Sequence, residues 1–388
     1  MWAATLPPST PIVISIFGIQ HHPQTQSNPN DESNTNPLIK PLTALLPKST
    51  NTTHITQTTP VHTEIWLTYW PSPTTYHEWW TSDPVSSFWS SLADNAGIYR
   101  EILTVPPSRT QHGTNTNTEE KMQGMAVLGE YTSVLDKSGY WGCYYDRMRD
   151  TESKEGRCTL GSRSQCQSGA GGVKMPRVHS PLGNSGDKEP TRIRIGRVKP
   201  NIPDNITFVV EGQDHTSVSG EEKVHWLRRF DSLARNWIGD LVDAGPERGI
   251  LDARVCYDAS SGIFSGPASA PAPAAPAAPE LDSNTASNPS VTAETQPPPN
   301  PLDFNRKIQL FYFLDMESME KIGRENTGHV RLRREFLKDY GPGGVMGELA
   351  GGSGLCLWVE VSILMGSEVE CEYVGCIEGT GLGSMVDG

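Results

Sequence analysis

The seven cysteines of this chain form none of the spacings that bind metals or attach haem. No two of them are separated by two residues, so the chain has neither a CxxC pair nor a CxxCH sequence. This spacing argues against a zinc site and against covalently attached haem. Because an odd number of cysteines fits a reducing compartment, we expect a cytoplasmic protein.

Long apolar segments and basic residues are also scarce. No run of about 18 apolar residues occurs, and the N-terminus has no basic leader. Acidic residues outnumber basic ones, 45 against 32, which gives a formal net charge of −13. A surface of this charge repels the phosphates of nucleic acids and of anionic lipids. We therefore predict neither a membrane nor a nucleic-acid partner.

Apolar and aromatic residues are sufficient for two modest cores. Of 388 residues, 36% are hydrophobic, and the chain has 10 Trp and 11 Tyr. Three segments lack this material: residues 151–190 are rich in Gly, Ser and Lys, 265–301 in Ala and Pro, and 341–354 in Gly. We predict a flexible insert at 151–190, a disordered insert at 265–301 and a loop at 341–354.

Apolar runs and capping residues divide the rest of the chain into two stretches with a similar order of elements. Each stretch alternates strands with helices, as β-α-β-α-β in the first, which suggests a duplicated ferredoxin-like unit. We therefore predict an α+β fold in which two ferredoxin-like halves form a dimeric-type α+β barrel. The predicted units are an N-terminal half at 8–150, a connecting strand and helix at 191–264 and a C-terminal half at 302–388. The predicted strands cover residues 11–18, 65–70, 100–105, 249–256, 307–314 and 355–364, and the predicted helices cover 37–46, 72–80, 219–241 and a stretch from 315 or 318.

The helix predicted at 219–241 has two sequence signals. Ser219 and Glu222 have the spacing of a capping box, in which the two side chains cap the start of a helix. Apolar residues then recur at helical spacing, which predicts burial along a single face. That face consists of Val224, Leu227, Phe230, Leu233, Trp237 and Leu241.

Five segments carry most of the chemically informative residues. One of them places four aromatic rings beside two arginines, a combination that suits a flat, charged cofactor. In their order and spacing the segments resemble the haem-containing aldoxime dehydratases, a family that includes phenylacetaldoxime dehydratase. The similarity runs from about residue 11 to residue 382, interrupted by the inserts. The segments are Thr75–Asp83, Gly139–Arg149, Gly212–Thr216, Leu357–Leu364 and Glu372–Gly381.

The resemblance implies that the chain binds haem b and that its ferrous iron binds the nitrogen of a small-molecule aldoxime, which loses water to give a nitrile. Haem without covalent attachment needs a strong axial ligand, usually a neutral imidazole. The resemblance assigns His329 as this iron ligand, and Tyr140 and Trp141 as residues at the cofactor. From its own surroundings His329, which shares a helix face with Leu332 and Phe336, would be a core histidine. Several of the other histidines lie in predicted polar loops, among them His21, His22, His54 and His112.

The family places an Arg, a Ser and a His around the oxygen that leaves the aldoxime, where a proton must be supplied. Arg147 matches the arginine, and Arg149 is close enough to be its alternative. Thr216 stands at the position of the serine and keeps a hydroxyl. The position of the histidine holds Val359, which cannot donate a proton, so His215 is the candidate substitute.

These departures, with Ile377 at a second position where the family more often has a histidine, leave several readings open. The chain is a dehydratase with weak or altered activity, its gene model is faulty near the Gly-rich stretch, or it binds haem without dehydrating aldoximes. Another possibility is that the protein is neither an enzyme nor a haem protein: it binds no cofactor, and His329 belongs to the core. A Soret band separates this last reading from the others.

Ferredoxin-like halves often pair their sheets, so a homodimer and pairing within one chain both stay open.

Overall fold

The computed structural model describes residues 1–22, 36–48, 51–134, 148, 192–265, 300–347, 349 and 352–387. The insert predicted at 151–190, and the one predicted at 265–301 except for its ends, lie outside the described residues. The described part has an α+β architecture built on a large antiparallel sheet, which confirms the predicted class.

The N-terminal repeat has the element order β-α-β-β-α-β. Its strands lie in the spatial order β3-β4-β2-β5. The predicted β-α-β-α-β order was wrong because it lacked β3, whose sequence Thr-Thr-His-Ile-Thr-Gln has few apolar residues and resembles a polar loop. The elements are β2 (Ile12–Gln20), α1 (Ile39–Leu45), β3 (Thr52–Gln57), β4 (Thr63–Trp70), α2 (Pro73–Trp80), α3 (Asp83–Ser90) and β5 (Ile98–Val105).

The C-terminal repeat has the same pattern, with two helices in each crossover. Its strands lie in the order β12-β9-β11-β10. When the four strands of each repeat are numbered along the chain, both repeats have the spatial order 4-1-3-2. This equivalence agrees with the duplication that the sequence suggests. The elements are β9 (Ile206–Asp214), α7 (Gly220–Arg229), α8 (Asp231–Ala244), β10 (Ile250–Tyr257), β11 (Arg306–Phe313), α9 (Met316–Glu325), α10 (Thr327–Tyr340) and β12 (Cys356–Leu364).

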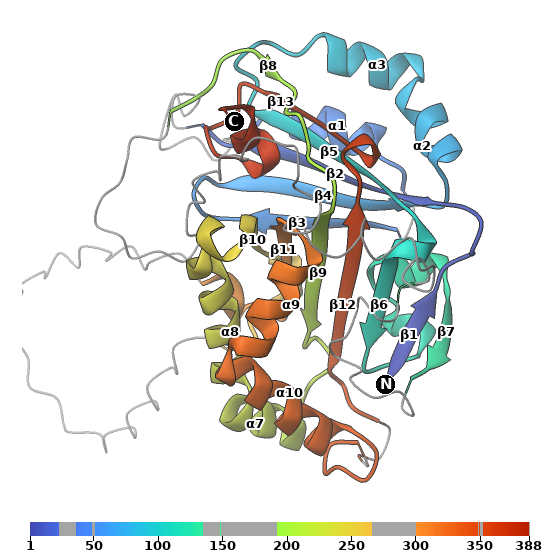
Figure 1. The fold of residues 1–388 in the computed structure, drawn as a ribbon, viewed down its shortest axis with the longest axis vertical. Helices are drawn as coiled ribbons and strands as arrows, with labels where there is room; N and C mark the ends of the chain where they lie inside the picture. Colours follow the sequence, from blue (N-terminus) through green and yellow to red (C-terminus); the bar gives the residue numbers. More distant parts are fainter. Residues whose placement is uncertain are drawn as a thin grey trace, which may run out of the picture.

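Together the described strands form one 13-stranded sheet. The repeats join where β10 pairs with β3, at Cys256 opposite Gln57 and Tyr257 opposite Thr56. In Figure 1 the strands of the N-terminal repeat run across those of the C-terminal repeat, and helices α7 to α10 lie together over the latter. A shared core contains apolar side chains from both repeats. The remaining strands are β1 (Trp2–Thr5), β6 (Thr110–Thr114), β7 (Glu130–Ser133), β8 (Arg197–Val198) and β13 (Val369–Val374).

A buried ion pair also connects the repeats. Arg254 on β10 and Glu101 on β5 are 2% and 0% exposed, and their Nη2 and Oε1 atoms are 2.6 Å apart. The Glu101 carboxylate also accepts hydrogen bonds from the hydroxyls of Tyr312 at 3.0 Å and Tyr373 at 2.5 Å. The Nε atom of Arg254 lies 2.7 Å from Asp252 Oδ2, so the guanidinium faces two carboxylates.

The region predicted as one helix from residue 219 is two helices that meet at Phe230. Because the chain turns there, Val224 and Leu227 are 65% and 40% exposed, and Trp226 is buried instead. The predicted capping box was also wrong. Ser219 makes no side-chain cap, and the Glu222 carboxylate accepts hydrogen bonds from the Gly-rich segment, including the N–H of Gly354 at 2.8 Å.

Two of the absences noted in the sequence have structural counterparts. Among the described helices, none is long and apolar enough to cross a membrane. The four cysteines in the described part, Cys256, Cys356, Cys371 and Cys376, are buried and form no disulfide. Burial also raises the pKa of these thiols, which keeps them protonated.

Candidate functional site

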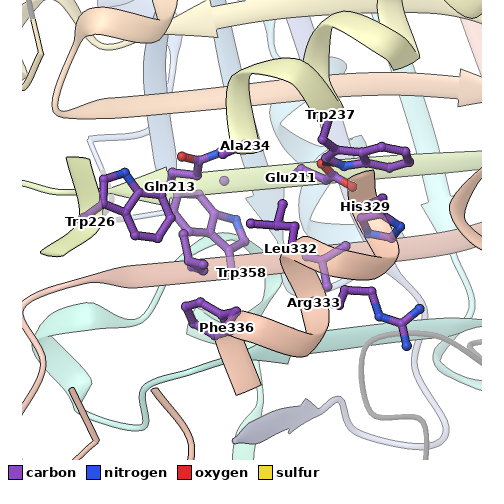
Figure 2. A pocket seen from close by; sticks show the side chains of 13 residues that line it. Glu211, Gln213, Trp226, Ala234, Trp237, His329, Leu332, Arg333, Phe336 and Trp358 are labelled. Carbon is purple, nitrogen blue, oxygen red and sulfur yellow. Dashed lines mark hydrogen bonds between the residues drawn. The ribbon is translucent and has the colours of Figure 1, made fainter. Parts of the chain in front are cut away.

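A cavity lies between the helices and the sheet of the C-terminal repeat, as Figure 2 shows. Most of its lining is apolar or aromatic, as in typical cofactor and small-molecule sites. Gly212, on β9, leaves room for the ring of Trp358 on the paired strand, because a Cβ atom there would lie 2.1 Å from that ring. The lining residues are Glu211, Gly212, Gln213, Trp226, Ala234, Trp237, His329, Leu332, Arg333, Phe336, Leu357, Trp358 and Val359.

His329 enters this cavity from the first turn of α10. The helix begins after Asn326, whose side chain accepts a hydrogen bond from the His329 N–H at 2.7 Å. The imidazole Nδ1 lies 2.9 Å from the carbonyl oxygen of Gly323, and the ring stacks on Trp237 with centroids 4.0 Å apart. Burial lowers the pKa of His329 to about 4, so the imidazole is neutral near pH 7. With Nδ1 donating to a carbonyl, Nε2 is the nitrogen that can bind a metal.

The predicted face of His329, Leu332 and Phe336 is confirmed as a structural feature. Their spacing of three and then four residues places all three on the same side of α10, and each lines the cavity. The role of His329 as an iron ligand stays a prediction.

Glu211 is a cavity residue that sequence reasoning missed. It lies on β9 directly opposite Val359 on β12, so both side chains project from the same face of the sheet. Its carboxylate accepts a hydrogen bond from Trp237 Nε1 at 3.2 Å. Burial raises the pKa of Glu211 to about 7, although the bond from Trp237 acts in the opposite direction. The only sequence signal was a carboxylate directly after the mostly apolar residues 206–210 of β9.

The polar groups of the cavity are few and differ in character. Besides the neutral imidazole and Glu211, the lining includes Gln213 and Arg333. The buried Nε of Arg333 has no hydrogen-bond partner among the described residues. This arrangement can hold a largely apolar group with an acidic edge, and it offers a carboxyl group that can exchange a proton near neutral pH.

The two predicted residues at the end of β9 lie outside the lining of this cavity. Thr216 is exposed, and its backbone N–H donates to Asp214 Oδ1 at 2.8 Å. His215 is buried behind Trp226, with ring centroids 4.8 Å apart, and its Nδ1 lies 3.3 Å from the carbonyl oxygen of Asn305. Burial holds the pKa of His215 well below its usual range, so its imidazole is neutral. Their catalytic roles stay predictions.

Four further predicted residues, Tyr140, Trp141, Arg147 and Arg149, lie outside the described residues. Met148, between the two arginines, is described and is buried in the apolar cluster that includes Trp237 and Val359. Met148 therefore lies beside the cavity, because Trp237 and Val359 line it.

Val359 and Ile377, the two positions at which the resemblance led us to expect a histidine, lie in different places. Val359 lines the cavity and is 5% exposed. Ile377 follows β13, and its N–H donates to Gln20 Oε1 at 2.9 Å in the N-terminal repeat. Of the two substitutions, the one at Val359 therefore changes the cavity.

Comparison with known proteins identifies relatives along most of the chain. The family model described as haem-containing dehydratase matches residues 15–382. The aliphatic aldoxime dehydratase of Rhodococcus erythropolis is 23% identical over 318 residues, which cover 81% of this chain and 70% of that relative. An aliphatic aldoxime dehydratase of a Pseudomonas species is 24% identical over 247 residues, or 63% of each chain.

Solved structures show the same fold. An aldoxime dehydratase crystallised with butyraldoxime has a TM-score of 0.65 and 18% identity, and the match covers 98% of this chain and 88% of that one. A second aldoxime dehydratase structure has a TM-score of 0.66 at 18% identity, with 98% and 90% covered. Because the family model spans nearly the whole sequence, the chain belongs to the haem-containing dehydratase family of the aldoxime dehydratases.

Proposed function

We propose that this protein is an aldoxime dehydratase that uses haem b with ferrous iron to convert an aldoxime into a nitrile and water. The observation that carries the proposal is the neutral imidazole of His329 in an otherwise largely apolar cavity. The relatives named as aliphatic aldoxime dehydratases favour an aliphatic substrate.

The residues present fit a haem. Nδ1 of His329 is hydrogen-bonded to a backbone carbonyl, which fixes the ring and directs Nε2 to a metal. Trp237 and Phe336 offer flat apolar surfaces, and Arg333 offers a cation for an acidic substituent. Bound haem would supply a ferrous iron for the oxime nitrogen.

The described cavity also contains a proton donor, Glu211. Loss of water from R–CH=N–OH breaks the N–O bond and the C–H bond and forms the third carbon–nitrogen bond. Glu211 gives its proton to the leaving hydroxyl oxygen, and the resulting carboxylate takes the proton from the carbon. One residue thus returns to its starting state, and the products are a nitrile and one water. Among the predicted groups, Arg147 and Thr216 would hold the oxime oxygen, with His215 as a second candidate acid.

The direct test uses haem-reconstituted, dithionite-reduced protein with butyraldoxime or phenylacetaldoxime added anaerobically. We expect a Soret shift and nitrile formation. His329→Ala should abolish stoichiometric haem binding, whereas His77→Ala, at an exposed histidine of α2, should leave it unchanged. Full haem retention by His329→Ala with an unaltered spectrum would contradict the ligand assignment.

The role of Glu211 has a separate test. Glu211→Gln keeps the shape and removes the acid, so turnover should fall by about 100- to 10,000-fold, while haem content stays the same. Glu221→Gln, at an exposed position of α7, is the matched control. Val359→His should raise turnover in the Glu211→Gln background, because it restores an acid opposite the lost one. Unchanged turnover in Glu211→Gln would rule out this residue as the acid.

A haem protein without dehydratase activity is the second candidate, and Val359 is the observation that favours it. A Soret band without nitrile formation by any aldoxime tested would establish this alternative. A cofactor-free protein, the third alternative, would show no Soret band after reconstitution.

We also propose that the two repeats close into a dimeric-type α+β barrel. The junction of β3 with β10 and the core shared between the repeats support this arrangement. The domain boundaries at 8–150, 191–264 and 302–388, the cytoplasmic location and a homodimer stay predictions.

A further inference from the structure

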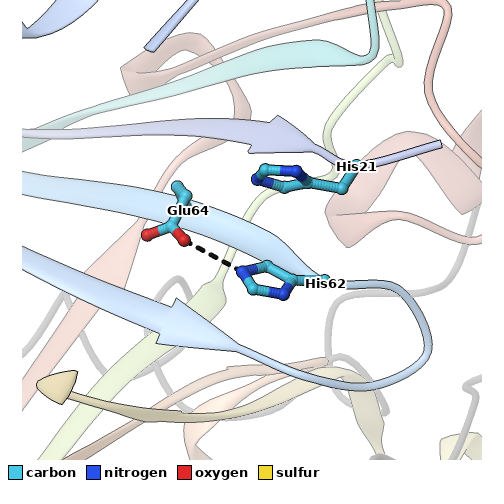
Figure 3. Close-up of side chains that lie close together, drawn as sticks. All are labelled: His21, His62 and Glu64. Atoms are coloured by element: carbon cyan, nitrogen blue, oxygen red, sulfur yellow. Dashed lines mark hydrogen bonds and ion pairs between the residues drawn. The ribbon is translucent and has the colours of Figure 1, made fainter. Parts of the chain in front are cut away.

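Two histidines and a carboxylate lie close together on the N-terminal repeat, away from the cavity of the C-terminal repeat (Figure 3). A third histidine contacts the same carboxylate. His21 follows the end of β2, His62 precedes the first residue of β4, and Glu64 lies on β4. His54 reaches the same carboxylate from β3. The predicted assignment of His54 to a polar loop was wrong, because β3 holds it in the sheet.

The side chains are close enough to share one ion. One ligand atom from each of His21, His62 and Glu64 lies within 4.8 Å of the others. His62 Nε2 is 2.9 Å from Glu64 Oε1, and the rings of His21 and His62 have centroids 4.5 Å apart. Atoms bound to one zinc ion at about 2.1 Å lie at most about 4.2 Å apart. His62 is half exposed, so its side chain has room to rotate when an ion binds.

A second observation points to a ligand. The Nε2 atom of His21 is buried and has no hydrogen-bond partner among the described residues. A buried polar atom without a partner costs free energy, and a bound cation would remove that cost. The backbone N–H of His21, in contrast to its ring, donates a hydrogen bond to the carbonyl oxygen of His62 at 2.9 Å. This bond holds the backbones of the two histidines next to each other.

Two of the three groups, His21 and Glu64, are also in the protonation states that bind metals. Burial, and then the charge of His62, lowers the pKa of His21, so its imidazole is neutral near pH 7. Burial alone would raise the pKa of Glu64, but hydrogen bonds from His54 and His62 hold it well below its usual range. Neutral imidazoles and an ionised carboxylate are the forms required of ligands.

We propose that His21, His62 and Glu64 form a binding site for a divalent metal ion of the zinc type. Two imidazole nitrogens and one carboxylate oxygen suit zinc, whereas calcium and magnesium prefer oxygen ligands alone. Three protein ligands leave a fourth position for water. The cysteine spacing argued against zinc, but that argument covers only sites built on cysteine.

His54 has a different role at this site. Its Nε2 lies 2.7 Å from Glu64 Oε2, the oxygen that His62 does not contact, and its ring stacks on Trp66 with centroids 4.7 Å apart. His54 therefore orients the carboxylate without taking part in the set of three ligands. A bound metal would tie the end of β2 to the β3–β4 hairpin.

The test is calorimetric titration of the full-length, haem-loaded, chelator-treated protein with zinc chloride. We expect one zinc ion per chain. His62→Ala and Glu64→Gln should weaken binding by about 100-fold or more, and His54→Ala by about 10-fold, as is usual for groups that orient a ligand. His77→Ala, an exposed histidine outside the cluster, should match the wild type.

Haem content and nitrile formation, measured on the same samples, keep this proposal separate from the proposed function. His62→Ala should lose zinc and keep haem, whereas His329→Ala should lose haem and keep zinc. Far-UV circular dichroism checks that the variants fold, which the half-exposed positions of His54 and His62 favour. Absence of stoichiometric zinc in the wild type, or equal zinc affinity in His62→Ala and His77→Ala, would overturn the site.

Discussion

The buried pair of Glu101 and Arg254 gives a sharp prediction about what holds the two repeats together. Glu101→Gln keeps the volume and removes the negative charge, and Arg254→Met removes the positive charge. Removing one partner of a buried ion pair costs about 3–5 kcal/mol, because the other charge stays buried without compensation. Both side chains are almost fully buried, so this range applies to them.

The surroundings of the pair place the two variants at different ends of that range. After Glu101→Gln, Arg254 still has Asp252 at 2.7 Å, so we expect a loss of about 3 kcal/mol. After Arg254→Met, Glu101 and Asp252 both lose their cation, so we expect a loss of about 5 kcal/mol. The double variant should lose less than the sum, by about 1–3 kcal/mol, because the two residues interact directly.

The assay is urea unfolding followed by tryptophan fluorescence. The free energies of unfolding are compared between variants whose dependence on urea concentration, the m value, is the same. The matched control is Glu325→Gln, which removes an exposed pair of Arg248 Nη2 and Glu325 Oε2 at 2.9 Å. At 48% and 51% exposure that pair should contribute about 0–1 kcal/mol. Losses no larger than the control, or strictly additive losses in the double variant, would refute the reasoning.

Two further predictions concern buried positions in and near the N-terminal repeat. Burial raises the pKa of Glu360 to about 8, and its carboxylate accepts a hydrogen bond from the Tyr69 hydroxyl at 2.8 Å. Because this pKa is higher in the folded state than in the unfolded state, stability is lost as pH rises from about 4.5 to 8, and Glu360→Gln should flatten that decline in thermal melts. A Cβ atom on Gly18 would lie 2.1 Å from the Tyr99 ring, so Gly18→Ala should destabilise by about 1–3 kcal/mol. Gly239→Ala, where a Cβ atom meets no neighbour within 4 Å, should be neutral or stabilising, and equal melting temperatures for the two glycine variants would contradict this prediction.

Strands with continuous apolar sequences were predictable, because burial on both faces leaves a clear signal. Ile12–Gln20 and Arg306–Phe313 are buried along almost their whole lengths, and both were expected from their apolar runs. Thr52–Gln57 and Thr110–Thr114 were not expected, because their sequences contain few apolar residues. Pairing with a neighbouring strand holds each in the sheet, the adjacent β4 for the first and the distant β12 for the second. His112 illustrates the difference: it was assigned to a polar loop, but it is buried on β6.

The same distinction applies to the sites. The cavity face of α10 was predictable because helical spacing brings His329, Leu332 and Phe336 together within one element. The cluster of His21, His54, His62 and Glu64 was not, because its members approach one another only after β2, β3 and β4 have paired. A histidine in a polar stretch has no sequence feature that distinguishes a metal ligand from a solvated side chain.

Val359 shows how this limit affects a functional interpretation. Taken along its own strand, valine in place of histidine means the loss of an acid. In the folded sheet, however, the residue directly opposite is Glu211, and directly opposed residues have Cβ atoms about 4.5–5.5 Å apart. A carboxyl group there can reach the same volume as a side chain at position 359, and burial keeps much of it protonated near pH 7. Position 359 and the carboxyl group that we propose as the acid, at 211, are therefore neighbours in space while 148 positions apart in sequence. The proposed change places the acid on the paired strand and leaves it facing the same cavity.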